Sequence, residues 1–95
     1  MEVRVKFPSV LRFKIGGVSE ITVDIGPDGD TVQHVLQQLI RRFPDLAEML
    51  CDRDGRFRPT IQIYLNDEHV RFHQGLHTAV AQNDLVYIVP MVMGG

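Results

Sequence analysis

The sequence is poor in the features that mark secreted, membrane-spanning and nucleic-acid-binding proteins. It has a single cysteine, Cys51, so no disulfide can form within the chain, and this favours a cytoplasmic protein over a secreted one. No run approaches the roughly 20 apolar residues that a membrane helix needs. The formal net charge is −2, and the Lys and Arg residues are scattered rather than gathered in a stripe, which argues against nucleic acid as a partner.

What the sequence does contain is the pattern of one small domain, with no internal repeat, low-complexity segment or linker. Four runs alternate apolar with polar residues, which predicts half-buried strands. Gly16-Gly17 supplies a turn between the first two runs, so these should pair as an antiparallel hairpin. The four runs are 2–8, 20–26, 60–65 and 85–89, and a further short strand is expected at 69–72.

One amphipathic helix is predicted after Pro27-Asp28-Gly29 breaks the chain. Apolar residues recur at helical spacing from Val32 to Phe43, whereas glutamines and arginines occupy the opposite face. Asp30 is expected to cap this helix, with Gln33 at the third helical position as a variant of the capping box. Pro44 is expected to end it.

These elements predict a mixed α+β fold of β-grasp, or ubiquitin-like, architecture over residues 1–90. One main helix can cover only one face of one sheet, and the handedness rule lets it cross over between parallel neighbours. The simplest closed arrangement places the first and last strands side by side at the centre, with the helix packed on one face. Residues 45–51 are expected to add one or two helical turns. The patterns leave the remaining strand order open.

Residues 91–95 are predicted to be a flexible C-terminal tail. Pro90 should end the last strand, because proline cannot donate a hydrogen bond to the ladder. Gly94 and Gly95 have no Cβ, so this end can thread a narrow channel and present the carboxylate of Gly95 to the active site of a partner. Taken alone, a terminal Gly-Gly is also compatible with an incidental flexible end.

Several motifs spread over nearly the whole chain carry a family resemblance. Residues 63–72 read Ile-Tyr-Leu-Asn-Asp-Glu-His-Val-Arg-Phe, residues 84–90 read Asp-Leu-Val-Tyr-Ile-Val-Pro, and the chain ends in Gly94-Gly95. Residues 7–12, Phe-Pro-Ser-Val-Leu-Arg, add to the pattern. In these motifs the chain resembles the ThiS/MoaD family of ubiquitin-like sulfur carriers, and most of all its CysO-like members that serve cysteine synthesis in actinobacteria.

The resemblance implies a carrier protein that is not itself an enzyme. An E1-like enzyme of the MoeB/ThiF type would adenylate the Gly95 carboxylate with ATP and Mg²⁺, and a sulfur donor would displace AMP to leave a thiocarboxylate. A sulfur-accepting biosynthetic enzyme would then pass the sulfur into cysteine or another thio-metabolite. The carrier itself is expected to bind no cofactor and to be a monomer when free.

Three other functions stay open at this point. The chain could be a MoaD-type small subunit of molybdopterin synthase, which would remain bound to one large subunit. It could be a ubiquitin-like binding module that is never activated, or a tag that is conjugated to protein lysines. The sequence names neither the sulfur acceptor nor the partner enzymes.

The last strand predicts a docking face. Val86 and Ile88 should face the helix, and alternation then places Leu85, Tyr87 and Val89 on the opposite face of the sheet. One helix cannot cover both faces, so an exposed apolar patch is expected there, and such a patch commonly marks a partner site. The alternative is that segment 45–59 folds over the patch. The expected docking residues are Tyr64, Leu85, Tyr87, Val89, Met91 and Met93.

No side chains combine into a predicted catalytic or metal site. His69, His73 and His77 are spaced four apart, as metal ligands on one helix face would be. The first of them falls in an expected strand and Gly75 interrupts the run, so solvated loop histidines are expected instead. Cys51 lies beside acidic residues, which do not activate a thiolate.

Overall fold

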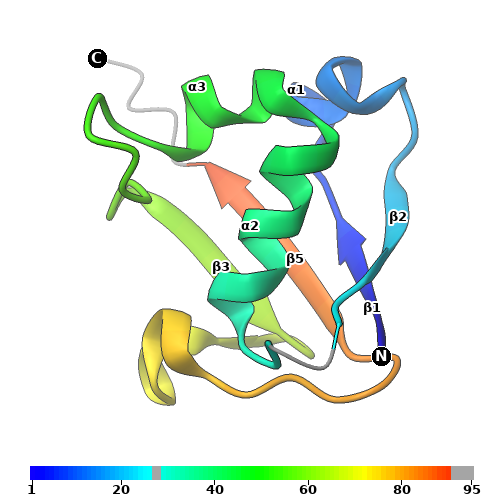
Figure 1. The fold of residues 1–95 in the computed structure, drawn as a ribbon, viewed down its shortest axis with the longest axis vertical. Coiled ribbons are helices and arrows are strands. Elements are labelled where there is room, and N and C mark those ends of the chain that lie inside the picture. The colour runs from blue at the N-terminus through cyan, green and yellow to red at the C-terminus, as the bar shows by residue number, and fades with distance from the viewer. Residues whose placement is uncertain (27–28, 91–95) are drawn as a thin grey trace.

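A computed structural model describes residues 1–26 and 29–90, and these form one five-stranded mixed sheet crossed by a main helix (Figure 1). The strand order is β2-β1-β5-β3-β4. The central pair, β1 and β5, is parallel and every other pair is antiparallel. The predicted β-grasp fold is therefore confirmed. The strands are β1 (Glu2–Lys6), β2 (Glu20–Asp24), β3 (Ile61–Leu65), β4 (Glu68–His69) and β5 (Leu85–Pro90).

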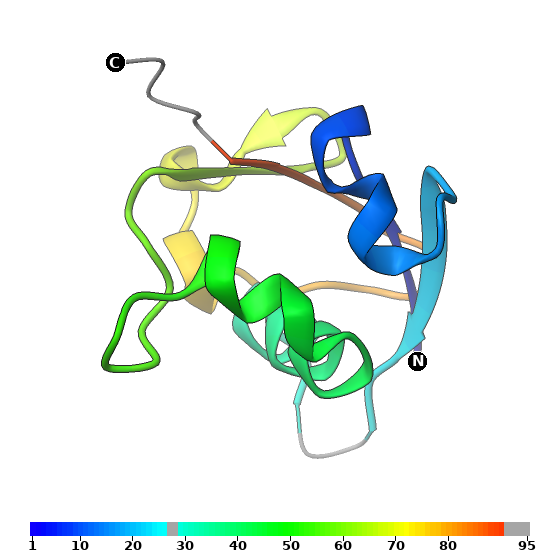
Figure 2. The ribbon, with the colours of Figure 1, turned by 90° about the horizontal axis from the view of Figure 1, so that it is seen from above.

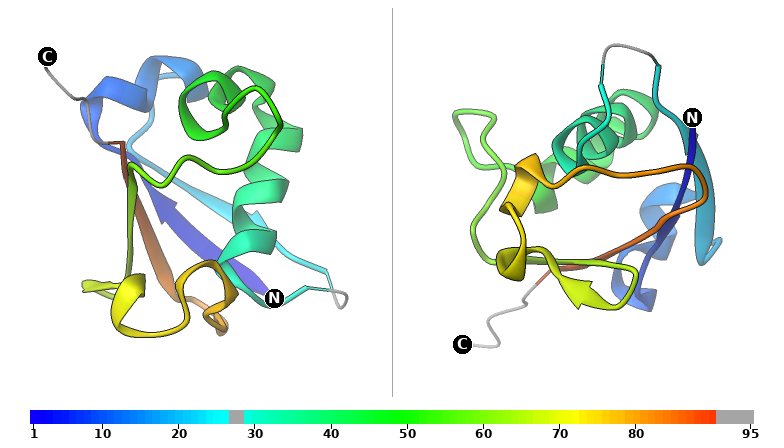
Figure 3. Two further views of the ribbon diagram at one scale, coloured as in Figure 1. Left: turned by 90° about the vertical axis from the view of Figure 1, so that its left-hand side faces the viewer. Right: turned by 90° about the horizontal axis from the view of Figure 1, so that it is seen from below.

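The core lies between the sheet and α2 (Val32–Arg42), which crosses one face (Figures 1 and 3). Alternate strand residues point toward the helix and are buried, because period two in a strand places every second side chain on one face. Val86 and Ile88 of β5 are both 0% exposed, as predicted. The helix buries Val32, Val35, Leu36 and Leu39 against them, and the sheet supplies Val3, Val5, Val23, Ile61 and Ile63.

The cap of α2 differs from the prediction. Thr31, and not Asp30, is the N-cap residue, and its Oγ1 accepts a hydrogen bond from the backbone N–H of His34. The His34 side chain makes the reciprocal hydrogen bond, in which its Nδ1 accepts from the backbone N–H of Thr31 at 3.4 Å. Histidine thus fills the place that glutamate or glutamine takes in the usual capping box. Asp30 is exposed, and its carbonyl accepts instead from the N–H of Val80.

Residues 9–15, to which no element was assigned, form two short helical turns. These are α1 (Ser9–Arg12) and the 3-10 helix η1 (Phe13–Ile15). They follow β1, which ends at Lys6 rather than at residue 8, and they bury Leu11 and Ile15 at one end of the core. Four-residue helices leave too few periodic positions to be detected from sequence.

The segment between α2 and β3 packs on the helix side of the sheet (Figure 2). It contains η2 (Pro44–Leu46) and α3 (Ala47–Leu50), in agreement with the expected helical turns. A bridge between Cys51 and Phe57 then closes a hairpin-like loop. Because this segment lies beside α2, the prediction that it could cover the opposite face of the sheet is wrong.

The strand expected at 69–72 is shorter than predicted and begins earlier. β4 is only Glu68–His69, and η3 (Val70–Phe72) and η4 (Gly75–His77) follow it. Asn66 and Asp67 form the tight turn from β3, with φ of 50° and 72°. Asn and Asp tolerate this left-handed region better than other residues with a Cβ. Val70 begins η3, and its side chain is buried in the core.

The cap assignment gives a stability test. Thr31→Ala removes the oxygen that accepts from the His34 N–H, so it should lower the free energy of unfolding by about 1 kcal/mol. The matched control is Asp30→Ala, which changes an exposed side chain and should alter stability by less than about 0.5 kcal/mol. Urea unfolding monitored by circular dichroism measures both. Equal losses for the two variants would contradict the assignment of Thr31.

Candidate functional site

The face of the sheet opposite α2, called the outer face below, leads along β5 toward the end of the chain (Figures 1 and 2). The register places Tyr64 of β3 opposite Tyr87 of β5. Lys6 of β1 lies beside Tyr87 on its other side, and His69 of β4 lies opposite Tyr64. One row of side chains therefore runs across four strands. Leu85 and Val89 lie on the same face, two residues before and after Tyr87.

The outer face is half-buried and partly polar, rather than the bare apolar patch that was expected. Tyr64, Leu85, Tyr87 and Val89 all have intermediate exposure. Neighbouring side chains shield the two rings. The Nζ of Lys6 lies 5.4 Å from the centre of the Tyr87 ring, and the His69 ring meets Tyr64 edge-on at 5.1 Å. Such cation–π and aromatic contacts cover apolar rings while keeping the surface wettable.

His69 is held by both ring nitrogens. Its Nδ1 accepts from the backbone N–H of Arg71 at 3.0 Å, so Nε2 carries the proton and donates to Oε1 of Gln62 at 2.5 Å. We assign this tautomer from the two partners. Burial lowers the pKa of His69, and the nearby charge of Arg71 lowers it further. The lowered pKa favours the neutral form of the His69 ring, which lies edge-on to Tyr64.

The start of β5 is tied to the β3–β4 turn by side-chain hydrogen bonds. The Asn66 amide nitrogen donates to Oδ1 of Asp84 at 3.0 Å, and its oxygen accepts from the N–H of Leu85 at 2.9 Å. The other oxygen of Asp84 accepts from the N–H of Ala81. Asn66 and Asp84 both lie in the motifs of the family resemblance. Together their side chains hold the first residue of β5 against the β3–β4 turn.

The remaining predicted site residues, Met91, Met93, Gly94 and Gly95, lie outside the described residues, as does the boundary of the tail at 91–95. β5 itself extends to Pro90, which lies opposite Ile61. The described part of the site is therefore the outer face together with the strand that carries the tail.

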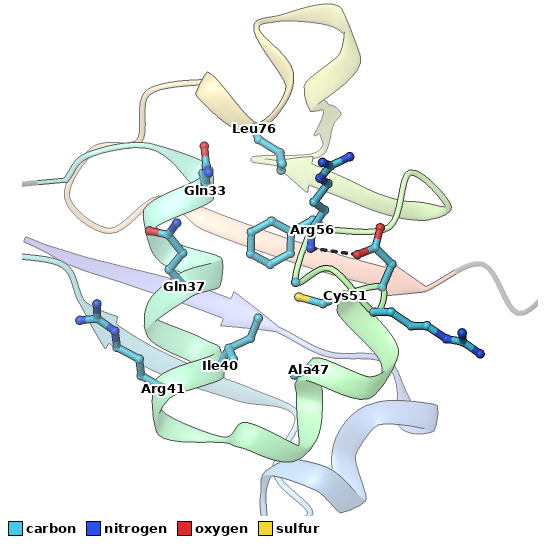
Figure 4. A pocket seen from close by; sticks show the side chains of 12 residues that line it. Gln33, Gln37, Ile40, Arg41, Ala47, Cys51, Arg56 and Leu76 are labelled. Atoms are coloured by element: carbon cyan, nitrogen blue, oxygen red, sulfur yellow. Dashed lines mark hydrogen bonds between the residues drawn. The ribbon is translucent and has the colours of Figure 1, made fainter.

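A hollow lies on the helix side of the sheet, between α2 and the loop after α3 (Figure 4). It has a volume of about 790 Å³ and is open to solvent. Its lining contains one nucleophile, Cys51, which is mostly buried. Burial raises the pKa of the Cys51 thiol, Asp52 raises it further, and Arg58 opposes the shift only in part. A neutral thiol is a weak nucleophile, so this hollow offers no activated group.

The histidines do not converge on a metal. His73 lies 3.2 Å from Oε1 of Glu68, whereas His69 points to Gln62 and His77 lies in η4. Within residues 1–26 and 29–90, no three metal-ligating side chains are close enough to hold an ion. None of the helices described there has the length and apolar character to cross a membrane.

Sequence reasoning did not identify Lys6, Gln62 and His69 as parts of the outer face. Alternation alone places Gln62 beside Tyr64 on one strand, so that residue could have been found. Lys6 and His69 reach the tyrosines only through the registers of β1 with β5 and of β3 with β4. No local pattern specifies those registers.

Known proteins resemble the chain along its whole length. The family model described as the ThiS family matches residues 5–95. Sulfur carrier protein CysO of Mycobacterium tuberculosis H37Rv is 38% identical over 97 residues, covering all of both chains. Small archaeal modifier protein 3 of Haloferax volcanii is 32% identical over 96 residues, also covering both chains. A chain in the crystal structure of the Amycolatopsis orientalis BexX/CysO complex matches with a TM-score of 0.76 and 32% identity, over 98% of this chain and 99% of that one.

The environment of His69 predicts its titration. Its pKa should lie below the ordinary value of 6.5, because protonation is opposed by burial and by the charge of Arg71. The unfolded chain then binds the proton more readily, so the free energy of unfolding should fall as the pH drops below 6.5 and through the lowered pKa. An NMR pH titration of the ring resonances measures the midpoint, and the urea-unfolded chain is the control. A folded-state midpoint at or above that of the unfolded chain would refute this environment.

Proposed function

This chain belongs to the ThiS family of ubiquitin-like sulfur carriers, and on that premise we propose that its working group is the carboxylate of Gly95. The observation that carries the proposal is the full-length similarity to the sulfur carrier CysO, combined with the Gly94-Gly95 end. In the proposed cycle an E1-like enzyme of the MoeB/ThiF type activates this carboxylate, and the resulting thiocarboxylate donates sulfur in the synthesis of cysteine or another thio-metabolite.

The chemistry needs no side chain of the carrier. A carboxylate is a poor electrophile, so the activating enzyme uses ATP and Mg²⁺ to join it to AMP with release of pyrophosphate. A sulfur donor then attacks the Gly95 carbonyl carbon and expels AMP, which leaves the thiocarboxylate. A thioacid is far more acidic than an alkyl thiol, so it is anionic at neutral pH and can attack the next substrate without an adjacent base.

The outer face is the proposed docking surface for the activating enzyme. Its half-buried rings, Tyr64 and Tyr87, lie on β3 and β5, and β5 continues to Pro90, the residue before Met91. A partner that covers these rings is at once beside the end of β5, so docking would aim the carboxylate at the active site. Aromatic residues with a polar end are favoured at such interfaces. The proposed contacts are Tyr64, Leu85, Tyr87, Val89, Met91 and Met93.

Conjugation to proteins is the second candidate, because one relative bears the name small archaeal modifier protein 3. The same activated Gly95 carbonyl could be captured by a lysine instead of a sulfur donor. Expression with the neighbouring genes separates the two. Intact mass should show a species about 16 Da heavier, in which sulfur replaces one oxygen of the terminal acyl group. A conjugating role would instead yield higher-mass adducts that contain Gly95 in an isopeptide bond.

The terminal residue gives the first functional test. Deleting Gly95 or adding one alanine after it should abolish adenylation. The deletion leaves the terminal carboxylate one residue short of the bound ATP, and the added alanine moves it one residue too far and introduces a Cβ. Pyrophosphate release with the cognate activating enzyme is the measurement. Adding the alanine while leaving the folded domain unchanged is the sharper variant, and circular dichroism checks that fold. Normal pyrophosphate release by either variant would overturn the carrier proposal.

The outer face gives the second test. Tyr87→Glu places a charge among the half-buried rings and should reduce kcat/KM for adenylation at least about tenfold, a loss of about 1.4 kcal/mol in transition-state stabilisation. Gln37→Glu adds the same charge to an exposed position on α2, on the opposite side of the sheet, and should leave kcat/KM unchanged. A folded Tyr87→Glu protein that is adenylated as well as Gln37→Glu would remove the outer face from the mechanism.

A further inference from the structure

We infer that Lys6 is the one lysine at which this chain accepts an acyl group, including the activated end of a second copy. The inference rests on the proposed function, since it concerns what an activated Gly95 can attack. The starting observation is a count: of ten basic residues, only Lys6 and Lys14 are lysines and the other eight are arginines. A guanidinium stays protonated in proteins, whereas a lysine amine is the usual acceptor in acyl transfer.

Lys14 is withdrawn from solvent. It lies in η1 and its side chain is only 14% exposed. Its Nζ lies 3.8 Å from Oε2 of Glu48 in α3 and 5.1 Å from the centre of the Phe13 ring. An acyl donor must approach the nitrogen lone pair after a proton has left. At Lys14 that requires the side chain to leave both partners and to move out of its partly buried position.

Lys6 is exposed on the outer face. Among the described residues its Nζ lies 5.4 Å from the centre of the Tyr87 ring and makes no hydrogen bond or ion pair, and Glu20 of β2 is its register partner on the other side. Because Lys6 is exposed as a residue, its amine can be approached from solvent. The two lysines therefore differ in access although they lie only eight positions apart in the sequence.

The acyl transfer balances without a further reactant. The neutral amine of Lys6 attacks the Gly95 carbonyl carbon of a copy activated as its adenylate, the bond to AMP breaks and AMP leaves with the electron pair, and the proton released from the nitrogen goes to water. The product is an isopeptide bond between two copies. Because Lys6 touches Tyr87, an enzyme docked on the outer face would also cover Lys6. The acceptor in self-acylation must therefore be a copy that is not docked on the enzyme.

The first experiment tests access alone and does not depend on adenylation. The free, folded protein is treated with limiting sulfosuccinimidyl acetate and the labelled lysines are identified by peptide mass mapping. Acetylation of Lys6 should be at least about tenfold faster than that of Lys14, because Lys14 must open locally to react. In urea the two rates should converge. Glu48→Gln, which removes the ion pair at an exposed partner, should raise the rate at Lys14. Equal rates at both lysines in the folded protein would overturn the inference.

The second experiment supplies the electrophile chemically, so its failure says nothing against activation by an enzyme. A Lys6→Arg/Lys14→Arg chain carrying a synthetic thioester at Gly95, which has no lysine of its own, is incubated with wild type, Lys6→Arg or Lys14→Arg that ends in the free carboxylate. Wild type and Lys14→Arg should form a covalent dimer linked through Lys6, whereas Lys6→Arg should lose that dimer. Peptide mapping separates this product from linkage to the α-amine of Met1. Linkage through Lys14, or no lysine-linked dimer with wild type, would refute the assignment.

Discussion

The parallel pairing of β1 with β5 constrains the rest of the structure, because it joins segments from opposite ends of the described chain. Two parallel neighbours cannot be linked by a tight turn, so the intervening chain has to cross over a face of the sheet. α2 makes that crossing and buries its apolar stripe there. β2 and β3 then add at the two sides of the central pair, each antiparallel to its neighbour. One interaction thus decides the strand order, the helix layer and the face left without a helix.

This arrangement separates the buried core from the proposed docking face. The helix side holds the buried side chains and also Cys51, whose thiol pKa is raised by burial. The opposite face holds aromatic rings that are neither buried nor bare, because Lys6 and His69 lie against Tyr87 and Tyr64. Large exposed apolar patches promote association of small proteins. Lys6 and His69 keep these rings half covered. If a partner displaced these two side chains, it would bury the apolar ring surface beneath them.

Much of the fold could be predicted because it depends on local patterns. The alternation in β1, β3 and β5 and the helical period of α2 specify the elements, and proline and glycine mark their ends. Three features depended on tertiary contacts instead. Thr31 caps α2 through reciprocal hydrogen bonds with His34. Val70 follows β4 with its side chain buried in the core. The short turns at 9–15 bury Leu11 and Ile15 at one end of the core. Alternation gave Tyr64, Leu85, Tyr87 and Val89 on the outer face, but only the strand registers show that Lys6 lies beside Tyr87 and His69 beside Tyr64.

The hydrogen bonds of Asn66 with Asp84 and Leu85 hold the beginning of β5 in place. β5 lies between β1 and β3, so both halves of the sheet depend on it. A chain cut short before β5 would lose the partner of both β1 and β3, and the sheet would separate into two isolated hairpins. Such a fragment has neither a core nor an outer face. Under the proposed function, a copy that lacks β5 would therefore offer an activating enzyme neither the proposed docking face nor the terminal carboxylate, because β5 contributes to the outer face and precedes Gly95 in the chain.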